Sequence, residues 1–398
     1  MRDVGIVMPV YKQDPNYLEL ALRSVLQQTY GNYYLVIVSD GAPPDTVEVI
    51  QKVTKGDERV HLILKEKNEG VAKTLNIGFD YFMQLDEVKY FTWVSSDNIY
   101  YPMYVEKLRT ALNNAPANVG LAYSSFRHID HNGDFLKEPN FEEFYKYQDQ
   151  PKEALLDFCF IGTSFMYKKE IAAKIEGYKL EPVEDYEYWL RLTDYCEIVY
   201  IPEALMHYRT NSPLSVSAQL RNSKAEHRRW RYAFNLARQE ARNRRKVPFL
   251  LTIIYPVQDG KEGTIEKLEQ LLEQTFSNFK LIIIDRSFDK SAINVLQHIE
   301  DPRIKFLNLP GVTERESILK GMKEADTPFT LIYGKGNFPS SPLILNDFII
   351  QGRQLQVNHI ALVDHNVFKV GKRLILSKEA PVFGNLYKTE KLKEILSI

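Results

Sequence analysis

The chain lacks the features that mark membrane, nucleic-acid-binding and disulfide-stabilised proteins. Its 398 residues include two cysteines, Cys159 and Cys196, too few for a disulfide framework and typical of a reducing compartment. No apolar run approaches the roughly 20 residues that span a bilayer. The net charge of -1 argues against nucleic acid as a partner, because phosphate binding usually leaves a basic excess. We therefore expect a cytoplasmic protein without a transmembrane segment, whose N-terminus enters a strand rather than a signal peptide.

The chain is long enough for two domains, and two stretches follow the same plan. Residues 5–41 contain an apolar strand, a helix ending in Gln-Gln-Thr-Tyr, and a second apolar strand ending in Ser-Asp-Gly. Residues 251–287 repeat the strands, and their helix ends in Glu-Gln-Thr-Phe. Asp40 of the first copy is replaced by Arg286 in the second. Such a repeat indicates one supersecondary plan used twice, and the difference points to the first copy as the one that does chemistry.

The first half alternates strands with helices, which predicts an α/β fold with a mainly parallel sheet. The expected strands are Val4–Met8, Leu35–Val38, Val60–Leu64 and Tyr90–Val94, and the expected helices are Leu18–Gln28, Thr46–Val53 and Val71–Phe82. Ligands of such sheets bind beyond the carboxyl ends of the strands. We therefore expect a ligand to face residues 9–14, 39–44, 67–70 and 95–102.

Five short motifs along the chain resemble those of the inverting glycosyltransferases of family 2, which have the GT-A fold. In order, they are Pro9-Val10-Tyr11, Ser39-Asp40-Gly41, Asn68-Glu69-Gly70, Ser95-Ser96-Asp97-Asn98 ahead of Pro102, and Glu184-Asp185. The similarity runs from residue 4 to about residue 217. It implies a nucleotide-binding half over residues 1–112 and an acceptor half over residues 113–217. The implied donor is a UDP- or dTDP-sugar, and the implied acceptor is a hydroxyl of a glycan or envelope component.

The resemblance assigns the nucleotide site to loop residues at the ends of the strands, together with Lys73 in the helix expected over residues 71–82. These are Pro9, Val10, Tyr11, Asp40, Gly41, Asn68, Lys73, Ser96 and Asp97. The carboxylate of Asp40 can accept a hydrogen bond from the imide N–H of a pyrimidine, and Gly41 lets the backbone turn closely past the ligand. Two other interpretations stay open: Asp40-Gly41 as an ordinary turn, and Tyr11 as loop packing.

Asp97 is the expected ligand of Mn²⁺ or Mg²⁺, because hard cations take oxygen ligands and can keep several waters. The family pattern has two acids here, whereas this chain has Ser95-Ser96-Asp97-Asn98. The donor diphosphate would then have to complete the coordination. The alternative is an Asx turn that caps the helix starting near Pro102.

Asp185 is the expected general base, with Glu184 as the second choice, because an acceptor hydroxyl must lose its proton as the new bond forms. Acids are also common at helix starts for capping reasons alone. Gly162 and Thr163, within the expected strand 158–167, would lie beside the acceptor or serve packing. His207 is a weaker candidate for the phosphates or metal, and Asn211 stands where the family often has a histidine.

The rest of the chain carries no second set of these motifs. Residues 218–247 form a basic helical linker, and its stretch 220–246 has ten basic and two acidic residues. Its arginines are expected to pair with acids of both domains or, alternatively, to contact an anionic membrane surface or an acidic partner. Tyr333-Gly334-Lys335-Gly336 is expected to stand where the first copy has Ser95-Ser96-Asp97-Asn98, so that Lys335 replaces Asp97. Residues 248–398 therefore read as a degenerate GT-A-like domain retained for packing, dimerisation or acceptor recognition.

Two functions from different classes follow. The first is a metal-dependent, inverting glycosyltransferase that acts by a single displacement. The second is a non-catalytic sugar-nucleotide-binding or scaffold protein derived from such an enzyme, for which the lone Asp97 and the missing histidine argue.

Overall fold

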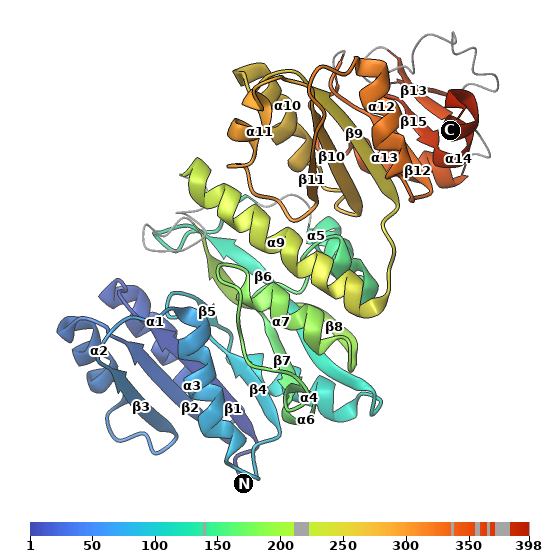
Figure 1. Ribbon diagram of the computed structural model, residues 1–398. Helices are drawn as coiled ribbons and strands as arrows, with labels where there is room; N and C mark the ends of the chain where they lie inside the picture. The colour runs from blue at the N-terminus through green and yellow to red at the C-terminus, as the bar shows by residue number, and fades with distance from the viewer. Residues whose placement is uncertain are drawn as a thin grey trace. The chain divides into compact units, whose positions relative to one another are not determined.

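The chain forms two compact units, Met1–Ala241 and Arg242–Ile398, in a computed structural model (Figure 1). The structure describes residues 1–137, 141–210, 223–335, 338–354, 359–363, 367–370 and 383–397. No helix within these ranges is long and apolar enough to cross a membrane. The expected α/β fold with a second, smaller α/β unit is confirmed.

An eight-stranded sheet forms the centre of the first unit within the described residues, in the order β3-β2-β1-β4-β7-β6-β8-β5. Its strands are β1 (Val4–Val10), β2 (Tyr33–Asp40), β3 (Val60–Lys65), β4 (Tyr90–Trp93), β5 (Ile99–Tyr100), β6 (Val119–Ile129), β7 (Phe165–Lys168) and β8 (Glu197–Arg209). The first four strands pair in parallel, as the strand-helix alternation predicted. Antiparallel pairing begins where β7 joins β4.

Helices cover both faces of this sheet. They are α1 (Pro15–Leu26), α2 (Pro44–Thr54), α3 (Val71–Met83), α4 (Tyr104–Asn114), α5 (Phe141–Gln148), the short η1 (Lys152–Leu156), α6 (Lys169–Ala172), α7 (Glu184–Leu192) and α9 (Lys224–Arg245). Ile6 and Met8 of β1 belong to the core with α1, α2 and α4. Val7, which points to the other face, belongs to the core with α3 and α7. Both faces of β1 are therefore buried, which explains its continuous apolar run.

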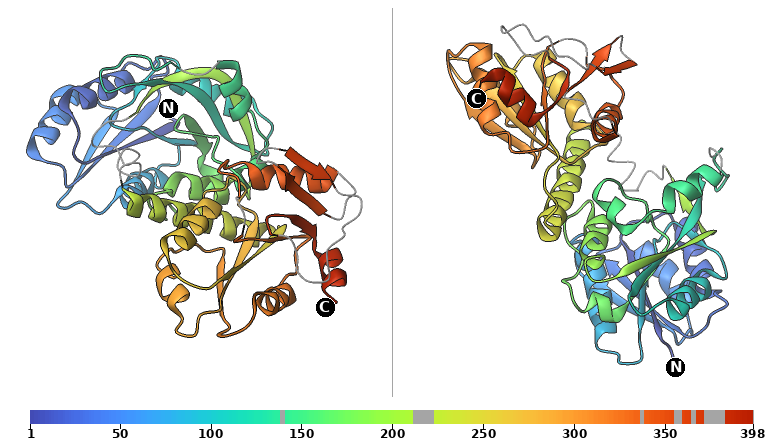
Figure 2. Two further views of the ribbon diagram at one scale, coloured as in Figure 1. Left: turned by 90° about the horizontal axis from the view of Figure 1, so that it is seen from above. Right: turned by 90° about the vertical axis from the view of Figure 1, so that its right-hand side faces the viewer.

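The second unit repeats the first half of this plan. Its strands are β9 (Leu251–Val257), β10 (Phe279–Asp285), β11 (Ile304–Asn308), β12 (Phe329–Ile332), β13 (His359–Val363), β14 (Val367–Val370) and β15 (Leu386–Lys388). Its helices are α10 (Glu262–Leu272), α11 (Ser291–Leu296), α12 (Glu314–Lys323), α13 (Ile344–Gln354) and α14 (Thr389–Leu396). The order β11-β10-β9-β12 matches β3-β2-β1-β4. The sheet continues with β15, β13 and β14, so β11 and β14 are its two outermost strands (Figure 2).

Both units contain the same arginine contact before their third strand. Arg59 pairs with Asp57, donates to the last carbonyl of α1 and lies 4.6 Å from the ring centroid of Tyr33. Arg303 pairs with Asp301, donates to the last carbonyl of α10 and lies 4.2 Å from the ring centroid of Phe279. These repeated residues stabilise the fold and are not candidates for the site.

Candidate functional site

The parallel strands bring the expected nucleotide loops to one edge of the first sheet. Val10 lies opposite Ser39, and Asp40 lies opposite Lys65. β4 ends beside the middle of β1, since Trp93 lies opposite Val7. The edge therefore gathers Pro9, Val10, Tyr11, Asp40, Gly41, Asn68, Ser96 and Asp97. Val10 and Asp40 are buried, whereas the Tyr11 side chain is 50% exposed and available to a ligand.

Asp40 holds the loop after β3 in place. Its Oδ1 accepts a hydrogen bond from Glu69 N at 3.0 Å and its Oδ2 accepts one from Gly70 N at 3.1 Å. The Lys65 ammonium pairs with Oδ1, and both side chains are nearly inaccessible to solvent. A carboxylate has about four lone-pair directions, so these three contacts leave capacity for one more donor.

The loops that carry Gly41 and Asn68 touch each other. Gly41 has a φ of 66°, and a Cβ there would lie 2.5 Å from Asn68 N. A side chain would thus be strained both by the backbone conformation and by the contact. The glycine is required by this close approach, which brings the two motifs together.

Asp97 is buried in a polar turn after β4. Its Oδ1 accepts a hydrogen bond from Ser95 Oγ at 2.5 Å, and Gln13 Nε2 donates to the neighbouring Ser96 Oγ at 3.2 Å. Arg209 donates through Nε to the Asp97 carbonyl at 3.1 Å. Burial raises the pKa of Asp97, although the Ser95 hydroxyl and the Arg209 charge oppose that shift.

The turn can contribute one carboxylate to a divalent cation. Among the described residues, no group of three or more His, Cys, Asp or Glu side chains could hold a metal ion. A cation at Asp97 therefore needs oxygens from outside the protein, which a diphosphate offers. This donor set fits Mg²⁺ or Mn²⁺, which bind through one or two carboxylates together with substrate phosphates.

Glu184 and Asp185 begin α7, where no side chain caps the helix. The Trp93 indole N–H donates to Asp185 Oδ1 at 3.1 Å, which links this acid to the end of β4. Glu184 Oε2 is buried without a hydrogen-bond partner. Burial raises the pKa of Glu184 to about 7, with a contribution from Glu181. Burial, with the nearby Glu184 charge, raises the pKa of Asp185 well above its usual value. An acid held this way is suited to accept a proton near neutral pH.

Gly162 and Thr163 lie in a turn before β7, not in the strand expected over residues 158–167. Gly162 has a φ of 72°, and a Cβ there would lie 2.5 Å from the Phe126 ring, which prevents a regular strand. Thr163 Oγ1 lies 3.6 Å from Met206 Sδ. Burial raises the pKa of Cys159 to about 12, and the Asp185 charge adds to the shift, so this segment lies near Asp185.

The other expected residues have different surroundings. The Lys73 side chain on α3 is 69% exposed, with Nζ 3.5 Å from Glu69 Oε1, so it is free to reach a ligand. His207 lies opposite Ile99 in the sheet. Burial, with the charges of Arg127 and Arg209, lowers the pKa of His207. Asn211 lies outside the described residues.

Comparison with known proteins identifies the first unit. Residues 5–176 match the model of the family "Glycosyl transferase family 2". Residues 5–176 therefore carry a family 2 glycosyltransferase domain. The family predicted from the five motifs is confirmed.

Curated relatives share this domain at low identity. An uncharacterized glycosyltransferase from Rickettsia bellii is 23% identical over 350 residues, which cover 77% of this chain and 49% of that protein. The chain thus spans about half the length of this relative. The O-antigen biosynthesis glycosyltransferase WbnJ from Escherichia coli is 28% identical over 220 residues, 52% of this chain and 80% of WbnJ.

Solved structures also resemble the chain. The S. aureus TarS fragment 1-349 in complex with UDP-GlcNAc gives a TM-score of 0.46 at 10% identity, over 93% of this chain and 97% of that chain. The mannosyltransferase PcManGT from Pyrobaculum calidifontis, in complex with GDP-Man and Mn²⁺, gives a TM-score of 0.43 at 13% identity, over 61% of this chain and 64% of that chain.

The glycosyltransferase domain uses residues that the sequence analysis did not predict. They are Gln13, Lys65, Trp93, Glu181 and Arg209, each of which holds one of the motifs. Two of them had a signal in the sequence. Lys65 is the last residue of a strand that ends beside Asp40, and Trp93 lies two residues before the acidic turn that begins at Ser95. The contacts of the others join segments distant in sequence, for example Arg209 to Asp97.

The second unit replaces the nucleotide motifs with internal contacts. Val257 lies opposite Asp285 as Val10 lies opposite Ser39, so Arg286 occupies the place of Asp40. Arg286 Nε donates to the Val312 carbonyl at 3.1 Å, and its NH1 lies 3.8 Å from Glu314. Arg286 therefore serves the loop before α12.

The equivalence expected between Lys335 and Asp97 is wrong by one residue. Tyr333 N donates to the β9 carbonyl of Ile254 as Val94 N donates to the β1 carbonyl of Val7. Lys335 therefore corresponds to Ser96, and the counterpart of Asp97 lies outside the described residues. Lys335 Nζ pairs with Glu314 Oε2 at 2.6 Å, as Arg286 also approaches Glu314.

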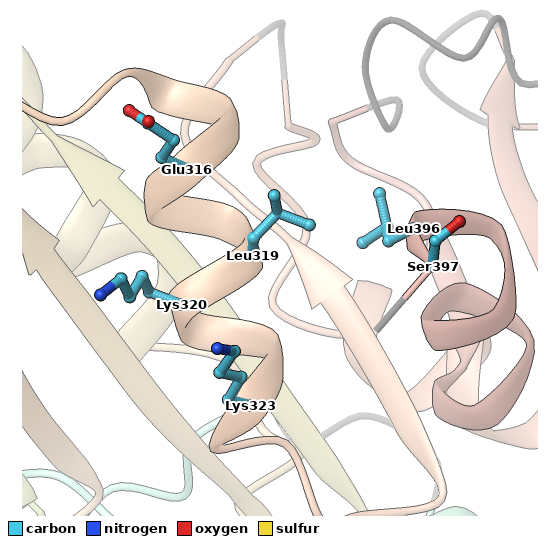
Figure 3. A pocket seen from close by; sticks show the side chains of 6 residues that line it. All are labelled: Glu316, Leu319, Lys320, Lys323, Leu396 and Ser397. Carbon is cyan, nitrogen blue, oxygen red and sulfur yellow. The ribbon is translucent and has the colours of Figure 1, made fainter.

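A hollow of about 510 Å³ lies in the second unit, between α12 and the end of α14 (Figure 3). Leu319 and Leu396 point towards each other across it. The residues that line it are Glu316, Leu319, Lys320, Lys323, Leu396 and Ser397. None of them belongs to the sites expected from the sequence, so the hollow adds nothing to the transfer site.

Proposed function

We propose that the chain is an inverting glycosyltransferase that transfers a sugar from a UDP- or dTDP-sugar to a hydroxyl of a glycan or envelope component. The position of Asp185 is the main support for this proposal. Its half-buried carboxyl group accepts a hydrogen bond from Trp93, which lies four residues before Asp97 in the sequence. This contact supports a shared site for the expected base and the expected diphosphate loop, because Trp93 ends the strand that leads into that loop. The family match of residues 5–176 supports the reaction class.

The donor is proposed to bind along the edge formed by the first four strands. Asp40 has room for the imide N–H of a pyrimidine, and Tyr11 and Lys73 are exposed enough to contact the ribose and phosphates. Mn²⁺ or Mg²⁺ bound through Asp97 would neutralise charge on the departing diphosphate. Ser96, held by Gln13, lies beside this turn.

Asp185 is proposed to take the proton of the acceptor hydroxyl as the hydroxyl attacks the anomeric carbon. The Trp93 N–H fixes the position of Oδ1, so the second carboxylate oxygen remains for the acceptor. Attack from the side opposite the diphosphate inverts the anomeric configuration in one displacement. Gly162 and Thr163, in the turn near Asp185, are the proposed contacts of the acceptor.

The test is nucleoside diphosphate release from a panel of UDP- and dTDP-sugars with Mn²⁺ or Mg²⁺, compared between wild type and Asp185→Asn. We expect release by wild type and a loss of about 100-fold or more in the variant, because general-base catalysis contributes about 10² to 10⁴. Glu170→Gln, an exposed acid on α6, is the matched control and should retain activity. If wild type turns over no donor, the proposal is wrong and the non-catalytic alternative holds. If wild type is active and Asp185→Asn is equally active, the assignment of Asp185 as the general base is wrong.

A further inference from the structure

The segment before the expected base is attached to helix α3. Asn76 Nδ2 donates to the Tyr178 carbonyl at 2.9 Å, and Tyr178 N donates back to Asn76 Oδ1 at 2.7 Å. Three residues further on, Glu181 Oε1 accepts a hydrogen bond from Ala72 N at 2.8 Å. The residues that lead to Glu184 and Asp185 are thus held at two points on one helix of the nucleotide-binding half.

Glu181 supplies what the start of α3 lacks. This helix begins after Gly70, has no side-chain cap of its own and has no acidic residue in its first turn. The first N–H groups of a helix have no partner within the helix and favour a nearby carboxylate. Glu181 provides that carboxylate from 109 residues away. The contact therefore stabilises α3 and fixes Glu181 at the same time.

Gly70 lies between two carboxylates. Its N–H donates to Asp40 Oδ2 at 3.1 Å, and a Cβ on it would lie 2.5 Å from Glu181 Oε1. Its φ of 98° also disfavours any side chain. The loop that Asp40 positions and the segment that precedes Asp185 therefore meet at this glycine, with no room for a side chain between them.

We propose that Glu181 is a positioning residue for the transfer reaction. It joins the loop of residues 67–70, which is proposed to face the donor, to the segment that carries Glu184 and Asp185. This inference rests on the proposed function. Glu181 acts through the Ala72 N–H and through its charge, without touching the reacting atoms. Together with the Asn76 contacts to Tyr178, the Glu181 contact fixes the segment that leads to the expected base against the start of α3.

The proposal can be tested through the effect of the Glu181 charge on the pKa of the neighbouring acid Glu184. Burial raises the pKa of Glu184, and the negative charge of Glu181 raises it further. Asp185 is surrounded by Glu184, the Trp93 N–H, Cys159 and Tyr178. Glu181→Gln keeps an oxygen for the Ala72 N–H but removes the charge, whereas Glu181→Ala removes both.

The experiment compares these two variants with wild type and with Glu176→Gln. Glu176 is a matched control on the same segment, with a side chain that is 84% exposed. The first readout is the pH profile of kcat/KM together with KM for the donor. The second needs no activity: ¹⁹F NMR of protein labelled with 5-fluorotryptophan, in which the Trp93 signal, assigned with Trp93→Phe, follows the ionisation of the acids beside it.

For Glu181→Gln we expect the first proton lost by the pair Glu184 and Asp185 to be lost at lower pH, because Glu181 raises the pKa of Glu184. The acidic limb of the profile and the Trp93 signal should both report this change, with the donor KM unchanged. For Glu181→Ala we expect a higher donor KM and a loss of about 10-fold to 100-fold in kcat/KM, since small misplacements cost that much. Glu176→Gln should match wild type in every readout.

The proposal is overturned if Glu181→Gln leaves both pH titrations where wild type has them. Glu181→Gln alone decides the case if Glu181→Ala does not fold. The two proposals fail separately: absence of turnover by wild type rejects the proposed function, whereas the Trp93 titration still reports whether Glu181 acts on the acids of α7.

Discussion

At the scale of single residues, Glu184 and Asp185 are placed at a cost to stability. Both are half-buried, and the pKa values of both are raised mainly by burial. Because the folded state holds these protons more tightly than the unfolded chain, stability is greatest below the ordinary pKa and falls as pH rises through the folded value. The window for Glu184 extends from its ordinary pKa of 4.5 to about 7.

Glu184→Gln is therefore expected to increase the free energy of unfolding at pH 8 by about 1 to 3 kcal/mol relative to wild type, because the buried charge is removed. At pH 4 the difference should nearly vanish. Urea unfolding at both pH values measures it. Equal differences at the two pH values would contradict the link to ionisation.

Asp40 is expected to serve both the fold and the nucleotide. Asp40→Asn leaves the Lys65 ammonium with Glu69 at 3.3 Å as its remaining carboxylate partner, so unfolding should become easier by about 1 to 3 kcal/mol. Nucleotide affinity should also fall by about tenfold, the cost of one hydrogen bond to a charged group. Calorimetry and urea unfolding give the two quantities.

The double variant Asp40→Asn with Lys65→Met separates these roles. It removes the buried cation as well, so stability should recover while nucleotide affinity stays low. Recovery of the affinity too would show that Asp40 acts only on the fold.

The residues of the candidate site were predictable because their positions follow from strand ends. A parallel sheet brings the carboxyl ends of its strands together, so Asp40 and Asp97 could be placed at one edge from the pattern alone. Their partners could not be placed, because contacts such as Ala72 to Glu181 join segments whose relative position depends on the whole fold. The sequence also aligned Lys335 with Asp97 instead of Ser96. The pairing of the strands, which decides this alignment, cannot be read from the sequence alone.

At the scale of elements, the boundaries depend on caps more than on apolar spacing. Helix α1 begins at Pro15, although its first buried residue is Leu18. Asp14 explains this, because its side chain accepts hydrogen bonds from Asn16 N and Tyr17 N. The apolar pattern locates the buried face of a helix, so it misses a first turn that faces solvent.

Helix α9 packs on the glycosyltransferase domain. Phe234 stacks on Tyr186 with ring centroids 4.1 Å apart, and Arg238 Nε donates to the Tyr186 hydroxyl at 3.1 Å. Arg238 also pairs with the Asp157 carbonyl. These contacts attach the basic helix to α7, the element that begins with the expected base, and account for Arg238 without an acidic partner or a membrane.

A fragment of residues 1–217 is therefore expected to be less stable than one of residues 1–245. The loss should be about 3 to 5 kcal/mol, because the shorter fragment exposes the apolar surface that α9 covers. Urea unfolding of the two fragments measures it, and Phe234→Ala in the longer one should give part of the same loss. Equal stability would show that α9 is dispensable for this domain.

At the scale of the whole molecule, the two units share the order of their first four strands, but the described residues of the second unit lack the acid that corresponds to Asp40. At the carboxyl ends of the strands of the second unit, Arg286 and Lys335 both form ion pairs with Glu314. We expect one nucleotide bound per chain by isothermal titration calorimetry, and none by residues 242–398 alone, provided that this fragment folds by circular dichroism. A stoichiometry of two would contradict the assignment of the second unit as degenerate.

The repeated arginine contact gives the second unit a use in protein engineering. Arg303 holds α10 and β10 as Arg59 holds α1 and β2, without any contribution from the transfer site. The strands and helices of the second unit can therefore serve as a scaffold onto which loops of the first unit are grafted. Grafting residues 39–41 and 67–70 onto their counterparts after β10 and β11 would ask whether nucleotide recognition is portable between two halves of one polypeptide.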